Sequence, residues 1–143
     1  ILSTYGGYLH EMFALYNAMH AISAPIYTIG LGKIMSAGVL LLAAGAKGHR
    51  KMGQHATLMI HPVTGGSYGN IFDQENELNE TKRLQELMID SYVDETTMTK
   101  TKILDMMSER RELFYTAEDA KKLGIIDTVI VKREEQTKKQ TAK

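Results

Sequence analysis

The sequence predicts an α/β fold with a parallel sheet, and three observations support this prediction. First, a strand-like run at 1–5, a helical repeat over 8–22 and a second strand-like run at 26–29 follow one another. A strand, a helix and a strand in this order form a right-handed βαβ unit with parallel strands. Second, a further apolar helix is predicted over 36–46, and third, a short apolar strand is predicted over 56–60, so that strands and helices continue to alternate.

Composition limits the classes of function. The chain has 143 residues, is 43% hydrophobic and carries a formal net charge of zero. This length supports one domain with a sizeable core, and the charge balance gives no indication of nucleic acid or an anionic membrane as a partner. The longest apolar run, 39–44, is too short to cross a bilayer. We therefore expect neither a nucleic-acid nor a membrane partner.

The chain contains no cysteine. This excludes disulfides, thiol catalysis and cysteine-based metal sites, and it fits a cytoplasmic location. The sequence begins without methionine and with a strand already under way, so we expect that an N-terminal segment precedes it.

The stretch 30–45 is the part of the chain around which we expect a site to form. The run at 26–29 leads into a glycine turn, after which small residues surround Ser36 and an apolar helix follows over 36–46. The start of a buried helix has free N–H groups and the positive end of the dipole, which favour a developing negative charge. This position suits a nucleophile. The alternative is that Ser36 only caps the helix.

His61 follows a short apolar strand predicted over 56–60, itself preceded by a basic turn at 47–53. Pro62 ends the pairing of that strand and fixes the direction in which the chain leaves it. A histidine at the carboxyl end of a parallel strand is well placed for chemistry, whereas a single histidine in a sequence is more often structural. Both interpretations stay open on these residues alone.

A long polar helix is predicted from residue 70 to about residue 97, after a glycine-rich segment at 65–69 that is flexible or extended. The apolar residues of this helix form only a narrow stripe. So long a helix with so few apolar residues is not surrounded by the rest of its own domain. We expect the helix to project and to pack against another subunit; a solvated surface helix is the alternative. The stripe consists of Ile71, Leu78, Leu84, Leu87 and Met88.

The C-terminal part of the chain predicts a short helix over 101–107, a charged connection over 108–115 and a further helix from Thr116. Thr116 and Asp119 have the spacing of a capping box, and Gly124 closes the helix. A strand follows over 125–131. Residues 132–143 are charged with almost no apolar side chains, so we expect a disordered tail after a folded domain that spans 1–131.

Several short motifs in one order resemble the proteolytic subunit of Clp proteases (ClpP), a family of serine peptidases with the crotonase-like fold. The resemblance covers about 2–131 and implies repeated β-β-α units with a protruding handle helix at about 70–97. The spacing between the Gly-Gly pair, Ser36 and His61 is that of the family. The motifs are Gly6-Gly7, Ser36-Ala-Gly, Leu41-Leu-Ala-Ala-Gly45, Met59-Ile-His61, Gly65-Gly66, Glu109-Arg-Arg-Glu-Leu-Phe114, Thr116-Ala-Glu-Asp-Ala120 and Leu123-Gly-Ile-Ile-Asp127.

The resemblance implies that Ser36 is the nucleophile and His61 the general base of a serine endopeptidase. The acid that orients the histidine is an aspartate in the family, and Glu112 stands at its place after a longer loop. Glutamate orients histidine in other hydrolases, so we take Glu112 as the third member. Asp105 and Glu109 are the alternatives.

The resemblance places the oxyanion-hole N–H groups on Gly7 and Ala37, and contact with the substrate strand on Gly65 and Gly66. Two further positions depart from the family pattern. Tyr5 replaces a proline before the Gly-Gly pair, and Ala37 replaces a bulky residue. We therefore expect Tyr5 to alter how the substrate strand docks and Ala37 to leave a roomier first substrate pocket.

The family also implies partners. Two seven-membered rings stack into a tetradecameric barrel through the handle helix, and an AAA+ ATPase unfoldase feeds unfolded polypeptides into it. No metal and no organic cofactor is implied, because ATP belongs to the partner.

Two other functions remain open. The first is a catalytically weak or inactive ring subunit, which the altered third residue favours. The second is an acyl-CoA enzyme of the crotonase type that uses Gly7 as an oxyanion donor. Lys33, three residues before Ser36, is a candidate for a Ser–Lys dyad. The predicted glycine turn argues against it, because the two side chains would meet only if Lys33 were itself in the helix.

Overall fold

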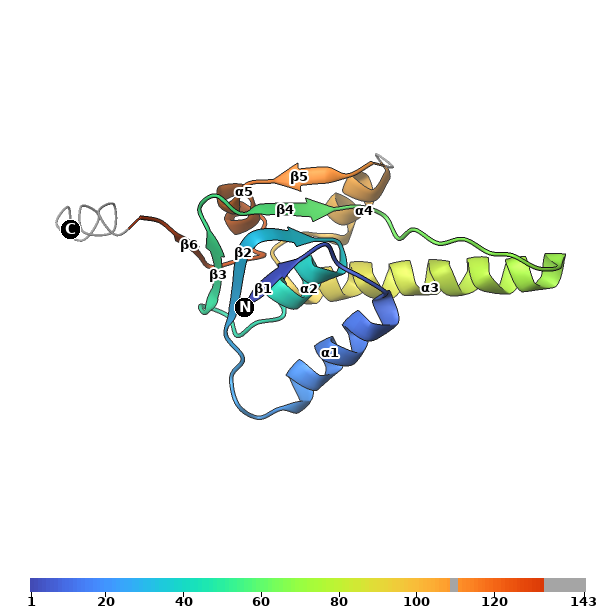
Figure 1. The fold of residues 1–143 in the computed structure, drawn as a ribbon, viewed down its shortest axis with the longest axis horizontal. Coiled ribbons are helices and arrows are strands. Elements are labelled where there is room, and N and C mark those ends of the chain that lie inside the picture. Colours follow the sequence, from blue (N-terminus) through green and yellow to red (C-terminus); the bar gives the residue numbers. More distant parts are fainter. Residues whose placement is uncertain (109–110, 133–143) are drawn as a thin grey trace.

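The computed structural model describes residues 1–108 and 111–132, and it confirms the α/β class (Figure 1). One mixed sheet has the strand order β5-β4-β2-β3-β6, and β1 pairs with β2 beside this path. Every pair is parallel except β4 with β5. The strands are β1 (Leu2–Thr4), β2 (Thr28–Met35), β3 (Arg50–Gly53), β4 (Thr57–Ile60), β5 (Leu113–Tyr115) and β6 (Thr128–Ile130); the helices are α1 (Leu9–Ala21), α2 (Ala37–Ala43), α3 (Ile71–Glu95), α4 (Lys100–Ser108) and α5 (Ala117–Lys122).

The predicted βαβ unit is confirmed. Strand β1, helix α1 and strand β2 follow in this order, and β1 and β2 are parallel. The predicted strand before His61, the long polar helix and the short helix after it also correspond to β4, α3 and α4. These elements have strong local patterns, which is why the sequence alone reveals them.

The predicted glycine turn between the strand at 26–29 and the helix is wrong. Strand β2 continues through Gly30 and Gly32 as far as Met35. The pairing with β1 shifts there, since Leu2 lies opposite Gly30 and Thr4 opposite Ile34. Gly32 has a φ of +68°, so the glycine forms an irregularity inside the strand, where a bulge bends the chain without ending the ladder.

Two strands were missed. Residues 50–53, predicted as part of a basic turn, form β3 between β2 and β6. Residues 113–115, predicted as part of a charged connection, form β5 on the edge of the sheet. Both are only three or four residues long, and their pairing comes from neighbours far away in the sequence. The predicted disordered tail, 132–143, lies outside the described residues except for Lys132.

Helix α2 is the centre of the core, and it ends at Ala43, earlier than predicted. Its side chains at Val39, Leu40 and Leu42 have no exposed surface. The helix packs against β2 and is also in contact with α1 and α3. A helix that is apolar all round is stable only when it is enclosed in this way. The position of its first residue is therefore rigidly defined.

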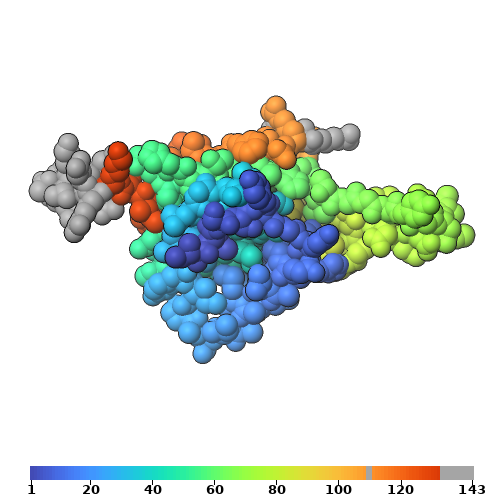
Figure 2. Space-filling model, viewed as in Figure 1, coloured from blue at the N-terminus to red at the C-terminus, as the bar shows by residue number. Residues whose placement is uncertain are grey.

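Helix α3 extends well beyond the body of the molecule (Figures 1 and 2). Asn70 and Asp73 form a capping box at its start. Near its other end Met88, Ile89 and Tyr92 are buried in the core, whereas the projecting half is exposed. A capping box stabilises a helix end that has no tertiary support. Within the described part of the chain, no helix is long and apolar enough to cross a membrane.

A buried arginine joins three elements. Arg50, 5% exposed, donates from Nη2 to Oδ1 of Asp127 at 2.6 Å and from Nε to Oδ2 at 3.0 Å. Its Nη1 donates to the carbonyl oxygens of Glu95 and Ala43 at 2.8 and 3.3 Å. The guanidinium therefore connects β3 to the ends of α2 and α3 and to the turn before β6, and none of its charge is left unpaired.

Hydrogen bonds from the Arg50 side chain lower the pKa of Asp127 from its ordinary value of 3.8 to about 2. Because the folded carboxyl has the lower pKa, its contribution to stability is present above about pH 4 and is lost as the pH falls towards 2. We expect Asp127→Asn to lower the free energy of unfolding at pH 7 by about 1 to 2 kcal/mol, and to weaken the acid dependence of stability. Urea unfolding between pH 7 and pH 3 measures both effects.

Asp90→Asn is the matched control, because Asp90 forms an ion pair with Lys100 in which both side chains are more than half exposed. Exposed pairs contribute little. Equal losses in the two variants would contradict a special role for Asp127.

Candidate active site

Ser36 stands at a sharp turn between β2 and α2. Its φ of 55° and ψ of −126° are unusual for a residue with a side chain, and it is the only non-glycine residue with positive φ in the described ranges. The Ser36 amide donates to the carbonyl oxygen of Met59 in β4 at 2.8 Å, which fixes the turn to the next strand. Such a strained strand-to-helix turn lifts a serine hydroxyl out of the backbone.

Gly6 makes room for this turn. The Gly6 residue has a φ of +98°, and a Cβ there would lie 2.7 Å from Cβ of Ser36 and 2.9 Å from the carbonyl oxygen of Met35. Real Cβ atoms do not approach so closely, and only glycine tolerates this φ without strain. The connection between β1 and α1 therefore passes directly against Ser36.

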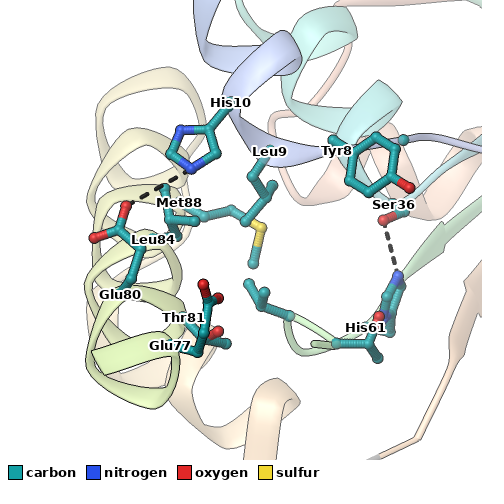
Figure 3. Close-up of a pocket in the computed structure, with 13 residues that line it drawn as sticks. Tyr8, Leu9, His10, Ser36, His61, Glu77, Glu80, Thr81, Leu84 and Met88 are labelled. Atoms are coloured by element: carbon teal, nitrogen blue, oxygen red, sulfur yellow. Dashed lines mark hydrogen bonds and ion pairs between the residues drawn. The ribbon is translucent and has the colours of Figure 1, made fainter. Parts of the chain in front are cut away.

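His61 faces Ser36 from the end of β4. Its Nε2 lies 2.8 Å from Oγ of Ser36 (Figure 3). Met35 and Met59 are register partners in the parallel pair of β2 and β4, so the residues that follow both strands meet at one edge of the sheet. The Ser36 side chain makes no capping hydrogen bond with α2, although the residue occupies the N-cap. The hydroxyl is thus directed to the imidazole and not to the helix.

The structure does not bring Glu112 to His61. Glu112 is exposed, and no described residue makes a hydrogen bond or ion pair with it or with Nδ1 of His61. Leu113 is nevertheless the antiparallel partner of Ile60, so the same register continued by one residue sets Glu112 opposite His61. The alternative Asp105 is exposed on α4, and the alternative Glu109 lies outside the described residues.

Two backbone amides lie beside Ser36. Ala37 is the first residue of α2, where an amide has no partner within the helix, and Gly7 lines the same cavity as Ser36 and His61. Neither amide has a backbone or side-chain acceptor among the described residues. Both are therefore available to an external oxygen atom.

A cavity of about 420 Å³ opens beside the Ser36–His61 pair. Figure 3 shows α3 on one side of it and Ser36 and His61 on the other. Val63 and Thr64 contribute to its lining, whereas Gly65 and Gly66 line a separate and smaller hollow against α3. The amide of Val63 donates to Oε1 of Gln85 at 3.2 Å, which fixes the start of this segment beside the helix.

Helix α3 contributes one wall of this cavity, which was not predicted from the sequence. Glu77, Thr81, Leu84 and Met88 line it, and their spacing of four, three and four residues puts them on one face of the helix. This spacing is visible in the sequence, but the neighbouring residues do not indicate which element this face of the helix packs against.

Lys33 does not form a dyad with Ser36. Its ammonium group lies over the ring of Tyr5, 4.3 Å from the centroid, and Lys33 is in the middle of β2. The aromatic residue that replaces the family's proline thus engages this lysine through a cation–π contact. Within the described ranges, no group of three or more histidine, aspartate or glutamate residues is arranged to hold a metal ion.

An α/β protein that presents a serine to a histidine at a strand-to-helix elbow, beside an open cavity, has the arrangement of a serine hydrolase. The family model described as Clp protease matches residues 1–133. Over 132 residues the chain is 38% identical to the ATP-dependent Clp protease proteolytic subunit of Borreliella afzelii, with 92% of this chain and 66% of that protein covered. Over 125 residues it is 38% identical to the subunit of the same name from Deinococcus radiodurans, with 87% and 60% covered.

The chain therefore belongs to the Clp protease family, and the family implies the crotonase-like fold. This confirms the resemblance read from the motifs. The chain spans between 60% and 66% of the length of these two relatives.

Proposed function

We propose that this chain is the proteolytic subunit of an ATP-dependent Clp-type protease, a serine endopeptidase that cleaves unfolded polypeptides. The observation that carries the proposal is the 2.8 Å contact between Oγ of Ser36 and Nε2 of His61 at a strained elbow. A serine that served only as a helix cap would direct its oxygen to the amides of the first turn. Family membership supports the same activity.

In the proposed reaction Oγ of Ser36 attacks the peptide carbonyl carbon while Nε2 of His61 accepts the hydroxyl proton. The C–N bond then breaks, and the imidazolium returns the proton to the leaving amine. Water, deprotonated by the same imidazole, hydrolyses the acyl-enzyme. The amides of Gly7 and Ala37 donate to the oxyanion, and the loss of one such donor costs about 3 kcal/mol of barrier.

Glu112 is the proposed third member of the triad. Its support is the register of β4 and β5, which sets residue 112 opposite residue 61 when continued by one step. A rotation of the exposed Glu112 side chain towards Nδ1 would fix the tautomer of His61 that accepts from Ser36. Gly65 and Gly66, next to the cavity, remain the proposed backbone contacts of an extended substrate.

The proposed assembly is a pair of stacked seven-membered rings fed by an AAA+ unfoldase, in the cytoplasm and without a metal or organic cofactor in this subunit. The projecting half of α3 supports the ring contact, because Ile71, Phe72 and Leu78 are all more than half exposed there. Exposed apolar side chains on one element are typical of an interaction surface.

A catalytically weak ring subunit is the second candidate. The observation that favours it is Nδ1 of His61, which has no partner among the described residues while Glu112 is exposed. An imidazole without an orienting acid is a poorer base. The acyl-CoA alternative has no comparable observation in its favour.

We expect the purified protein to hydrolyse a short fluorogenic peptide, and we expect the hydrolysing species to be an oligomer. Activity and native mass are measured on the same fractions from a sizing column. Labelling with a fluorophosphonate probe reports whether the serine is reactive. An oligomer that neither reacts with the probe nor cleaves the peptide would favour the weak-subunit alternative.

A further inference from the structure

Carboxylates line the cavity on the wall opposite Ser36. Glu77 and Glu80 come from α3, and Figure 3 shows both on the helix side of the cavity, across from the Ser36–His61 pair. A group held in this cavity is therefore adjacent to the reacting serine at one end and to acidic side chains at the other.

The part of the cavity between these ends is apolar. Leu84 and Met88 of α3 and Leu9 of α1 line it, and Leu84 and Met88 are less than 10% exposed. A side chain that fits this space has an aliphatic stem. The stems of lysine and arginine pack along apolar surfaces in this way, with the charge at the tip.

The two carboxylates differ in what already neutralises them. Glu80 accepts two hydrogen bonds from Arg83, both 2.7 Å long, and its Oε1 is 3.7 Å from Nε2 of His10. The hydrogen bonds from Arg83 hold the pKa of Glu80 below its ordinary value. Glu77 has no ion pair or hydrogen bond within the described ranges, and neither lysine nor arginine lines the cavity.

We propose that this cavity receives a lysine or arginine side chain of the substrate, and that Glu77 selects its charge. The proposal rests on the proposed peptidase activity and gives it a substrate preference. A leucine side chain fills only the apolar part, whereas a basic side chain fills the same part and also pairs with Glu77. Arginine offers two parallel hydrogen bonds to the carboxylate and lysine a single charge.

The test compares two fluorogenic peptides that differ only in the residue before the scissile bond, lysine in one and norleucine in the other. Norleucine keeps the aliphatic stem and removes the charge. For the unmodified full chain we expect kcat/KM to be about fivefold higher for the lysine peptide, as for a partly exposed ion pair. We expect Glu77→Gln to bring the ratio near one and Glu77→Lys to reverse it.

Glu75→Gln is the matched control, since Glu75 is exposed on the same helix and does not line the cavity. It removes the same charge and should leave the ratio unchanged. Peptide hydrolysis with the same ratio in the unmodified, Glu77→Gln and Glu75→Gln proteins would overturn the inference and leave the peptidase assignment intact.

A binding measurement separates this inference from the peptidase assignment. Fluorescence anisotropy of the two peptides with the Ser36→Ala variant requires no turnover. Tighter binding of the lysine peptide that disappears with Glu77→Gln supports the inference, even if the unmodified protein hydrolyses neither peptide. Equal binding of both peptides, or binding of neither, rejects it.

Discussion

Replacing Ser36 by alanine should reduce kcat for peptide hydrolysis by about five orders of magnitude, because the nucleophile is lost and only binding and the oxyanion donors remain. Alanine keeps the Cβ atom, which lies in the crowded space beside Gly6. The measurement is hydrolysis of the fluorogenic peptide, with labelling by the fluorophosphonate probe as a second readout. Ser91→Ala is the control, since the Ser91 hydroxyl only donates to the carbonyl oxygen of Leu87 in its own helix and does not line the cavity.

Stability should respond in the opposite direction when Ser36 is replaced by glycine. The φ of 55° and ψ of −126° at this position cost a residue with a side chain about 1 to 3 kcal/mol. Glycine removes most of this strain. Replacing a serine N-cap by glycine costs only a few tenths of a kcal/mol. Ser36→Gly should therefore raise the urea midpoint while it abolishes hydrolysis. A large loss of stability in this variant would indicate that the hydroxyl serves the fold.

Replacing Arg50 by methionine should lower the free energy of unfolding by about 3 to 5 kcal/mol, which is the usual cost of removing one partner of a buried ion pair. The variant removes the side-chain donors to the Asp127 carboxylate, which keeps a hydrogen bond from the backbone amide of residue 50, and it removes one donor from each of two carbonyl oxygens. This loss exceeds the one expected for Asp127→Asn, because Arg50 is almost fully buried and Asp127 is 22% exposed. Urea unfolding at pH 7 measures it.

Lys51→Met is the control for Arg50→Met, because Lys51 is the next residue on the same strand and its side chain is exposed. We expect less than about 0.5 kcal/mol from it. Adding Asp127→Leu to Arg50→Met should recover part of the loss, since an apolar pair of similar size often replaces a buried ion pair at little cost. A loss below about 1 kcal/mol for Arg50→Met itself would contradict the role assigned to this network.

Much of the fold follows from patterns between residues that are close in the sequence. The periodicity over 9–21 and 71–95 reveals α1 and α3, and the Thr116–Asp119 spacing reveals the capping box that the structure contains at the start of α5. Strands β3 and β5 have no such pattern. Arg50 becomes part of a strand because Asp127, far along the chain, neutralises its charge in the core.

The sequence by itself determined the α/β class, the family motifs and the placement of a histidine directly after a predicted strand and of a serine at the start of a buried helix. Only the tertiary structure decided that Ser36 and His61 lie within hydrogen-bonding distance, that Glu112 is exposed without a hydrogen bond to His61, and that one face of α3 closes a cavity over the pair. The physical reason is that caps and periodicities depend on neighbours along the chain. The distance between two side chains at different strand ends depends on the register of the sheet and on how the helices pack against it.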